Sequence, residues 1–239
     1  MGNWIVSHLL ARGEDPAAIR ILDLQSPRQQ LLDQGVVFIQ TNITDKKAVS
    51  GAFSQPWPST KSIDQLPLTV YHTAAVIRFS ERHRALLPLC TNVNVDGTRN
   101  VLEAARAAGA SCFIATSSGS VGLRLPSFWI APWEKVPQGL VQVLSDRADG
   151  QPKEYGQFFG NYSASKFEAE MMVRSADDPR SKFRTGCIRP SNGVYGTGAD
   201  NSGSVLGLYL RSGGNPTYVY PSNLRKRRTS ANKVDGPPG

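Results

Sequence analysis

The stretch from 68 to 117 decides the fold, with LTVYHT at 68–73 and SCFIATS at 111–117. Both runs are short, apolar and rich in β-branched or aromatic side chains, as buried strands are. The segment 89–108 between them repeats apolar residues at helical spacing: Val95, Val101, Leu102 and Ala105. A strand, a long helix and a second strand in this order predict two parallel strands joined by a crossover helix.

The same alternation continues on both sides of this unit. Further strand-like runs occupy 18–24 (AIRILDL), 36–39 and 185–189. Helix-like segments occupy 4–10, 25–34, a short stretch from 45, and 160–175. Short apolar strands that alternate with helices are typical of a parallel sheet with helices on both faces. The sequence therefore predicts an α/β fold with a doubly wound parallel sheet of the Rossmann type.

Composition excludes several classes of protein. With 239 residues, 40% of them hydrophobic and 19% charged, the chain can build a large core. No apolar run approaches the roughly 20 residues of a membrane span, and the N-terminus shows no secretory signal. Three cysteines lie far apart and three histidines lack metal-ligand spacing. We therefore expect a reducing compartment, with neither a disulfide framework nor a metal site.

The positive charge is concentrated at the end of the chain. The net charge is +8, and residues 224–239 contain five basic side chains against one acidic side chain. This segment has no hydrophobic period, so we expect a domain over 1–220 and a basic disordered tail over 221–239. A solvated tail explains the run Arg225–Arg228 better than nucleic-acid binding does.

A long irregular segment interrupts the alternation at 122–161. It contains several aromatic residues: Phe128, Trp129, Trp133, Tyr155, Phe158 and Phe159. Long loops in compact domains usually carry function. The aromatic content is compatible with an apolar ligand, although aromatic side chains also build the cores of loops.

The strongest chemical signal is YSASK at 162–166 on a predicted helix. Residues four apart on a helix are neighbours, so the phenol of Tyr162 and the ammonium of Lys166 would share one face. A phenol ionises near a pH of about 10, and an adjacent cation favours the phenolate. The pair predicts an acid/base unit, but the pattern alone also fits an exposed helix with a solvated lysine.

Three other segments accompany this unit along the chain. Thr116, Ser117 and Ser118 end a predicted strand, where doubly wound sheets bind ligands. Asn94 lies on the preceding helix, and RPSNGVYG at 189–196 follows the last strand. Together these segments resemble the extended short-chain dehydrogenase/reductase family, within it the 3β-hydroxysteroid dehydrogenase branch that includes sterol-4α-carboxylate 3-dehydrogenases. The resemblance covers residues 2–220.

The resemblance implies a catalytic role for four of these residues. Tyr162 would be the general acid/base that takes the proton of the substrate hydroxyl. Lys166 would lower the pKa of this tyrosine and bind the nicotinamide ribose. Ser118 would orient the substrate oxygen, with Ser117 as the alternative. Asn94 would hold a water molecule in the proton relay, the alternative being a packed helix asparagine.

The resemblance also implies an NAD site. Asp23, at the end of the strand 18–24, would bind the ribose hydroxyls and favour NAD over NADP, because a 2′-phosphate would meet a carboxylate. Its alternative role is a helix N-cap. The other implied cofactor contacts are Gly2, Asn42, Ile43, Thr73, Ala74, Ala75, Lys166, Pro190 and Ser191. His72 is expected to be structural.

The chain departs from the family at both ends. Relatives open with a strand and a TGGxGxxG turn, of which Gly2 alone is present, and this turn binds the pyrophosphate. In the strand order 3-2-1-4-5-6 the first strand is central, so 18–24 and 68–73 would lack their shared partner. Relatives also continue beyond 220 to complete the substrate lobe. We therefore expect a truncated chain that is unstable alone and binds NAD poorly.

The implied function is NAD-dependent oxidation of a 3β-hydroxyl group on a sterol-like substrate. We expect a small lipid-like substrate, no nucleic-acid partner and a homodimer. The expected location is the cytoplasm, with the surface of the endoplasmic reticulum membrane as the alternative. Two other functions stay open: a nucleotide-sugar epimerase/dehydratase or dihydroflavonol-type reductase on the same fold, and an inactive dinucleotide-fold protein that acts through partners.

Overall fold

The computed structural model describes residues 1–58, 66–78, 81–124, 152 and 154–190. The chain divides into two compact units, Met1–Gly193 and Val194–Gly239, and all described residues belong to the first. The tail expected at 221–239, most of the irregular segment at 122–161, and Ser191 lie outside the described residues.

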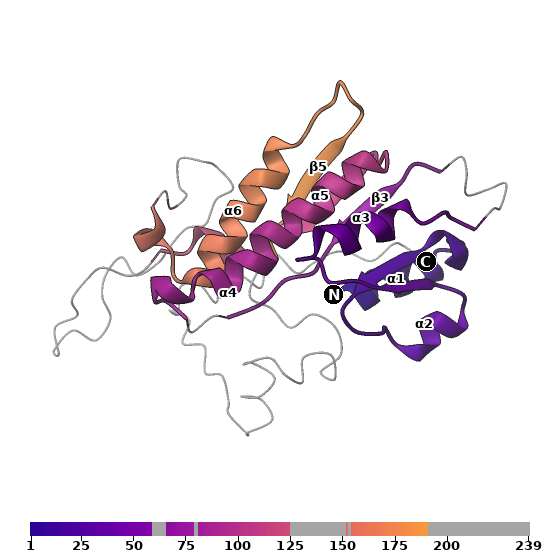
Figure 1. The fold of residues 1–239 in the computed structure, drawn as a ribbon, viewed down its shortest axis with the longest axis horizontal. Helices are drawn as coiled ribbons and strands as arrows, with labels where there is room; N and C mark the ends of the chain where they lie inside the picture. The colour runs from indigo at the N-terminus through magenta and orange to yellow at the C-terminus, as the bar shows by residue number, and fades with distance from the viewer. Residues whose placement is uncertain (59–65, 79–80, 125–151, 153, 191–239) are drawn as a thin grey trace, which may run out of the picture. The chain divides into compact units, whose positions relative to one another are not determined.

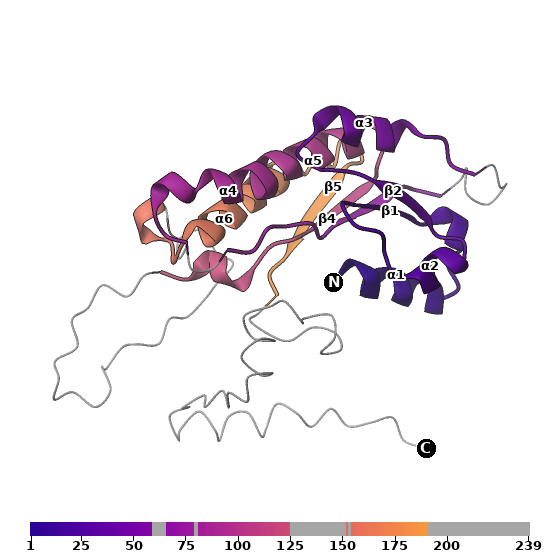
Figure 2. The ribbon, with the colours of Figure 1, turned by 60° about the horizontal axis from the view of Figure 1, so that its bottom comes forward.

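Parallel strands form two sheets in the described part of the chain (Figures 1 and 2). In the first sheet β1 (Arg20–Asp23) pairs with β2 (Val37–Gln40). In the second sheet β3 (Thr69–His72) and β5 (Arg184–Ile188) both pair with β4 (Cys112–Thr116). These pairings confirm the predicted α/β fold and its parallel strands.

Helices cover both faces of the strands. Figure 2 shows α3, α4, α5 and α6 on one side, and α1 and α2 on the other. Their bounds are α1 Gly2–Ala11, α2 Gln29–Asp33, α3 Lys46–Ser54, α4 Pro88–Thr91, α5 Thr98–Ala107 and α6 Asn161–Ser175. Short 3₁₀ turns occupy Pro16–Ala18, Arg84–Leu86, Gly119–Gly122 and Tyr155–Gln157. No helix among the described residues is both long and apolar enough to cross a membrane.

Local hydrogen bonds move two boundaries away from the predicted ones. The strand expected at 18–24 begins only at Arg20, because the side chain of Asp15 caps a 3₁₀ turn ahead of it. The helix expected at 25–34 begins only at Gln29, since Asp23 Oδ1 accepts a hydrogen bond from the Gln25 N–H at 3.0 Å. Such bonds from a side chain to the nearby backbone compete with regular structure.

The single helix expected at 89–108 is α4, a π-helical turn and α5 in succession. The π-turn spans Asn92–Gly97. A Cβ atom on Gly97 would lie 2.7 Å from Cδ1 of Ile43, so this position needs glycine. π-turns inside helices are rare and occur often at functional sites.

The described residues of this unit form two separate hydrophobic cores. The larger core packs α3, α5 and α6 against the second sheet and includes the fully buried Phe113 and Val173. The smaller core packs α1 and α2 against the first sheet, with four buried residues: Val6, Ile19, Leu31 and Val36.

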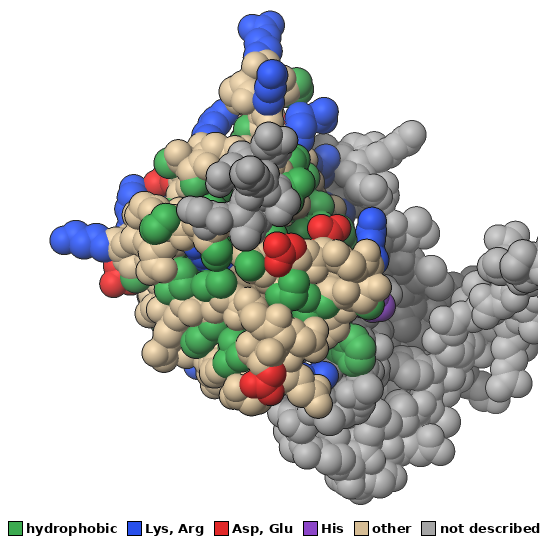
Figure 3. All heavy atoms as spheres, turned by 90° about the vertical axis from the view of Figure 1, so that its right-hand side faces the viewer, with side chains coloured by type: hydrophobic (Ala, Val, Ile, Leu, Met, Phe, Trp, Pro, Cys, Tyr) green, Lys and Arg blue, Asp and Glu red, His purple; other side chains and the backbone are tan. Residues whose placement is uncertain are grey.

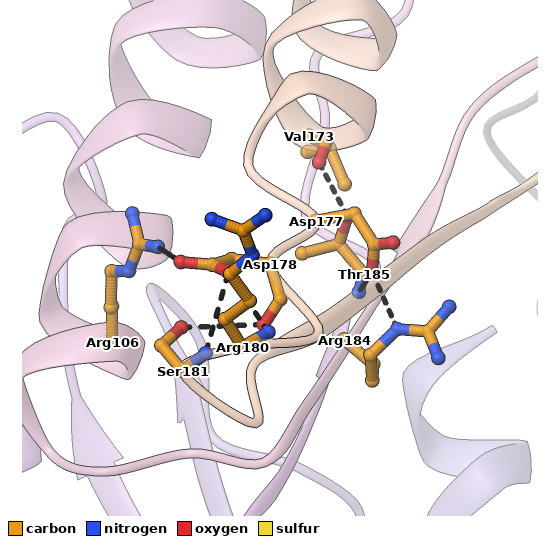
Figure 4. A network of polar contacts seen from close by, with 8 residues as sticks. All are labelled: Arg106, Val173, Asp177, Asp178, Arg180, Ser181, Arg184 and Thr185. Atoms are coloured by element: carbon orange, nitrogen blue, oxygen red, sulfur yellow. Dashed lines mark hydrogen bonds and ion pairs between the residues drawn. The ribbon is translucent and has the colours of Figure 1, made fainter.

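A polar network fixes the turn between α6 and β5 (Figure 4). Asp177 Oδ1 accepts hydrogen bonds from Arg184 Nε at 2.9 Å and from the Thr185 N–H at 2.8 Å. Asp178 accepts a hydrogen bond from Arg106 of α5 at 3.2 Å. This network sets the position of β5 against α6. The N-terminal end of α6 and the C-terminal end of β5, which lie away from this turn, carry residues of the candidate site described below.

β1 and β3 are edge strands, and no described strand pairs with both of them. This agrees with the expectation that 18–24 and 68–73 lack a shared partner. Large apolar side chains are exposed as well, among them Leu24, Tyr71 and Ile188. Figure 3 shows hydrophobic side chains that reach one face of the molecule in several places. Unpaired edges and exposed apolar side chains both favour association between chains.

We expect the purified 239-residue chain to aggregate through its strand edges. A lysine on an edge strand opposes edge-to-edge pairing, so Thr69→Lys in β3 should slow aggregation. Ser50→Lys on the exposed surface of α3 adds the same charge away from the edge and should have little effect. Light scattering during a thermal ramp measures the aggregation of both variants and of the unsubstituted chain. Equal aggregation of both variants, or reversible cooperative unfolding of the unsubstituted chain, would contradict this expectation.

Candidate active site

The carboxyl ends of the parallel strands gather the candidate residues at one edge. Thr73 directly follows β3, and Ser118 lies just beyond β4. The start of α1 reaches the same edge, because a Cβ atom on Gly2 would lie 3.2 Å from Thr73 Oγ1. Met1 Sδ also lies 3.5 Å from Thr116 Oγ1. Ligands of doubly wound sheets bind at such strand ends.

Tyr162 and Lys166 lie one turn apart on α6, and both are buried. Tyr162 is 6% exposed and Lys166 is 4% exposed. The alternative of an exposed helix with a solvated lysine is therefore wrong. Two buried ionisable side chains on one helix face make this pair a candidate acid/base unit.

The phenol of Tyr162 interacts with Ser118. Burial raises the pKa of Tyr162 above its ordinary value, and the hydrogen bond with Ser118 partly opposes this rise. The expected lowering of this pKa by Lys166 is not found, since Lys166 is not among the groups that shift it. Tyr162 is thus protonated at neutral pH, and it becomes a base only if a further positive charge comes near.

The ammonium of Lys166 is held at the end of β4. Nζ donates a hydrogen bond to the Thr116 carbonyl at 2.6 Å. Burial lowers the pKa of Lys166 to about 8, while the Glu170 carboxylate, and Cys187 in its ionised form, act in the opposite direction. Lys166 is therefore charged at neutral pH and loses its proton as the pH rises through about 8.

The two serines that follow β4 have different partners. Ser118 Oγ shares a hydrogen bond with Ser120 Oγ at 2.9 Å and accepts one from the Ser120 N–H at 3.2 Å. Ser117 Oγ donates to Glu170 Oε2 at 2.6 Å. Because Ser118 is next to Tyr162 and Ser117 points to Glu170, the geometry supports Ser118 as the substrate contact.

The side chain of Asn94 is fully buried in the π-turn, and both N–H groups of its amide are used. Oδ1 accepts a hydrogen bond from the Val76 N–H at 2.9 Å, and Nδ2 donates to the Val76 carbonyl and to Ser165 Oγ, each at 3.0 Å. The hydrogen bonds of Asn94 therefore connect the segment after β3 to α6. A water in a proton relay has no amide hydrogen left to bind here.

His72 has the structural role that was expected. Its Nε2 lies 2.9 Å from Thr98 Oγ1, and Thr98 donates to the carbonyl of Asn94 at 2.6 Å. Since the hydroxyl proton of Thr98 is used, His72 Nε2 carries the proton of this pair. Burial and the charge of Lys166 lower the pKa of His72 to about 3, so the ring is neutral.

Asp23 lies exposed at the carboxyl end of β1. Its Oδ1 accepts the Gln25 N–H, as described above. The N-cap of α2 is Arg28, so the alternative of Asp23 as a helix N-cap is wrong. The exposed carboxylate is accessible to a ligand at this strand end.

Two of the implied cofactor contacts, Asn42 and Ile43, form hydrogen bonds within the protein. Asn42 Oδ1 accepts hydrogen bonds from the Thr44 N–H at 3.1 Å and from Thr44 Oγ1 at 2.9 Å. Ile43 is buried in the larger core, and its carbonyl accepts a hydrogen bond from Asn100 Nδ2 at 2.9 Å. Asn42 is exposed, so it is the more accessible of the two.

The remaining implied contacts among the described residues lie at the carboxyl edge of the parallel strands. The side chains of Thr73, Ala74 and Ala75 are small and partly buried. Pro190 follows β5, and its carbonyl accepts a hydrogen bond from the Gly119 N–H at 2.8 Å. Short side chains after β3 leave room for a ligand to approach the backbone.

Sequence reasoning missed two buried polar residues of α6. Asn161 donates from Nδ2 to the His83 carbonyl at 3.0 Å and contacts the hydroxyl of Tyr155, which fixes the start of α6. Glu170 is 3% exposed and pairs with Arg189. The four-residue spacing of YSASK continues to Glu170, and that spacing was the available signal.

Comparison with known proteins identifies the family of this chain. The family described as "Male sterility protein" (NAD_binding_4) matches residues 1–213. The 3beta-hydroxysteroid dehydrogenase/Delta(5)-Delta(4) isomerase 1 of Caenorhabditis elegans is 31% identical over 180 residues, 75% of this chain and 32% of that protein. The decarboxylating sterol-4-alpha-carboxylate 3-dehydrogenase of Bos taurus is 28% identical over 200 residues, 82% of this chain and 44% of that protein. The chain thus spans less than half of these relatives.

Solved structures share the fold. A short-chain dehydrogenase/reductase superfamily protein from Agrobacterium tumefaciens with bound NAD has a TM-score of 0.52 and 25% identity, over 79% of this chain and 45% of that chain. UDP-glucose 4-epimerase from Thermotoga maritima has a TM-score of 0.53 and 19% identity, over 79% of this chain and 51% of that chain, and shows the fold alone. From the match over residues 1–213 and the shared fold, the chain belongs to the male sterility protein family of NAD-binding, extended short-chain dehydrogenase/reductases.

Proposed function

We propose that the chain is the catalytic region of an oxidoreductase that uses NAD to oxidise a 3β-hydroxyl group of a sterol-like substrate. The observation that carries the proposal is the buried Tyr162 phenol, paired with Ser118 and one turn from Lys166. A hydroxyl and a phenol side by side can orient an alcohol, and the phenol can accept its proton once it is ionised. The similarity to proteins named as 3β-hydroxysteroid and sterol-4α-carboxylate dehydrogenases supports the substrate class.

In this proposal Ser118 hydrogen-bonds the substrate oxygen, and Tyr162 takes the proton of the substrate hydroxyl. NAD supplies the hydride acceptor and a positive charge on its nicotinamide ring when it is bound. With a cation near, the phenol of Tyr162 ionises more easily despite its burial. The C–H bond of the substrate breaks as the hydride leaves, the C=O bond forms, and the proton passes from Tyr162 to solvent.

The described residues fit both ends of NAD. The exposed carboxylate of Asp23 can accept hydrogen bonds from ribose hydroxyls, and the ammonium of Lys166 can donate to the nicotinamide ribose. For the pyrophosphate, the described residues offer the first backbone N–H groups of α1, from Gly2 onward. We therefore expect NAD to bind weakly, and assays need saturating NAD.

Turnover tests the substrate class. The chain is incubated at saturating NAD with a 3β-hydroxysteroid, with its 3α epimer as the matched control, and with UDP-glucose. Formation of NADH and of a 3-ketosteroid from the 3β epimer alone supports the proposal. Turnover of UDP-glucose alone would favour a sugar-nucleotide enzyme, and NAD binding without any turnover would favour an inactive protein.

Tyr162→Phe should reduce turnover about 10²–10⁴-fold, because the variant lacks the group that accepts the substrate proton. Tyr71→Phe removes an exposed hydroxyl from β3 and is the control. Steady-state kinetics at saturating NAD compares the two. Near-normal turnover by Tyr162→Phe would refute the acid/base assignment.

Asp23→Ala should weaken NADH binding and bring the affinities for NADH and NADPH closer together, since the carboxylate favours a free 2′-hydroxyl. Asp33→Ala removes an exposed carboxylate from α2 and serves as the control. Nucleotide fluorescence titrations measure both affinities. If the unsubstituted chain prefers NADPH, Asp23 is not a ribose ligand.

A further inference from the structure

A buried carboxylate that the proposed reaction does not use lies one turn beyond Lys166. Glu170 is 3% exposed, and an ionised carboxylate is stable at such a site only when it is paired and hydrogen-bonded. Arg189 donates to it from Nε at 2.8 Å and from Nη2 at 2.6 Å. Ser117 donates at 2.6 Å, and Arg174 lies 3.3 Å away. Both carboxylate oxygens of Glu170 therefore have partners.

Two partners of Glu170 lie just beyond the carboxyl ends of two strands. Ser117 follows β4 and precedes Ser118, and Arg189 follows β5 and precedes Pro190. The two strand ends are also joined by backbone bonds, from the Ser117 N–H to the carbonyl that ends β5 and from the Gly119 N–H to the Pro190 carbonyl, each at 2.8 Å. Glu170 thus connects the ends of β4 and β5 to α6, the helix that carries Tyr162.

Charge couples Glu170 to Lys166. Burial raises the pKa of Glu170, but hydrogen bonds from Arg189 and Ser117 outweigh it and leave this pKa below its ordinary value. The resulting negative charge raises the pKa of Lys166 and so opposes the lowering caused by burial. Both side chains line one cavity of about 10 Å³, together with His72 and Cys187.

The other charged or titratable groups near this pair act in known directions. Arg189 at the end of β5 and Arg174 on α6 stabilise the negative charge of Glu170. His72 on β3 is neutral, with a pKa of about 3. Cys187 on β5 has its pKa raised to about 11 by burial and by Glu170, so the thiol is neutral. Among these groups Glu170 carries the negative charge at neutral pH.

We propose that Glu170 is a positioning residue of this site. Its carboxylate, held by Arg189 and Ser117, fixes the turn that carries Ser118 against α6 and favours the charged form of Lys166, one helical turn from Tyr162. The consequence for hydride transfer rests on the proposed function. The effect of Glu170 on Lys166 and on the turn does not depend on that function. The positioning role and the proposed function can therefore fail separately.

The direct test is the titration of Lys166 in the full 239-residue chain. Lysine side chains are labelled with ¹³C at Cε, and the Lys166 resonance is assigned with Lys166→Arg. The unsubstituted chain should titrate near pH 8. Glu170→Gln should shift the midpoint to lower pH, whereas Glu168→Gln on the exposed face of α6 should leave it unchanged. An unchanged midpoint in a folded Glu170→Gln variant overturns the proposal.

A milder variant covers the case in which Glu170→Gln fails to fold. Ser117→Ala keeps the ion pair with Arg189 and removes one hydrogen bond. It should speed amide hydrogen exchange at Gly119, which reports the turn, without moving the exchange of β5. Unchanged exchange at Gly119 overturns the proposal. If the unsubstituted chain oxidises no 3β-hydroxysteroid, the proposed function fails and these two readouts still decide the role of Glu170.

Discussion

The four-residue spacing along α6 is the constraint on which the site depends. A helix stacks residues at this spacing on one face, and here that face places Tyr162, Lys166 and Glu170 in a buried row. Each contacts a different part of the strand ends: Ser118, the Thr116 carbonyl, and the pair of Ser117 and Arg189. A shift of α6 by one residue would separate all three contacts at once, so the turn that joins α6 to β5 has a direct bearing on the chemistry.

The candidate acid/base pair and Asp23, the candidate ribose contact, lie on different elements. Tyr162 and Lys166 lie on α6, and Asp23 ends β1 in the two-stranded sheet. Arg20 of β1 bonds the carbonyls of Ala52, Gln55 and Pro56 at the end of α3, at 3.1, 3.1 and 2.9 Å. This contact is one of those that link the two sheets. NAD bound at both ends would add a further link, so we expect cofactor binding and folding stability to be coupled.

The sequence predicted the strand and helix order well, because short apolar runs and helical spacing reflect burial directly. It also predicted that Tyr162, Lys166 and Ser118 come together, because the carboxyl ends of parallel strands share one edge. It could not show that the amide of Asn94 is used by Val76, or that Ile43 is a core residue, since both depend on packing between distant segments. The pKa of Tyr162 was predicted in the wrong direction because the extent of its burial cannot be read from spacing.

Isotope transfer tests the central claim most directly, since it detects the hydride step even at low turnover. The chain is incubated with NAD and a 3β-hydroxysteroid that carries deuterium on C3, and the nucleotide is analysed by mass spectrometry. The account predicts deuterium in the NADH that forms, and its loss in Tyr162→Phe but not in Tyr71→Phe. NADH without deuterium, or the same transfer by both variants, would contradict the assignment of this site as the place where the alcohol is oxidised.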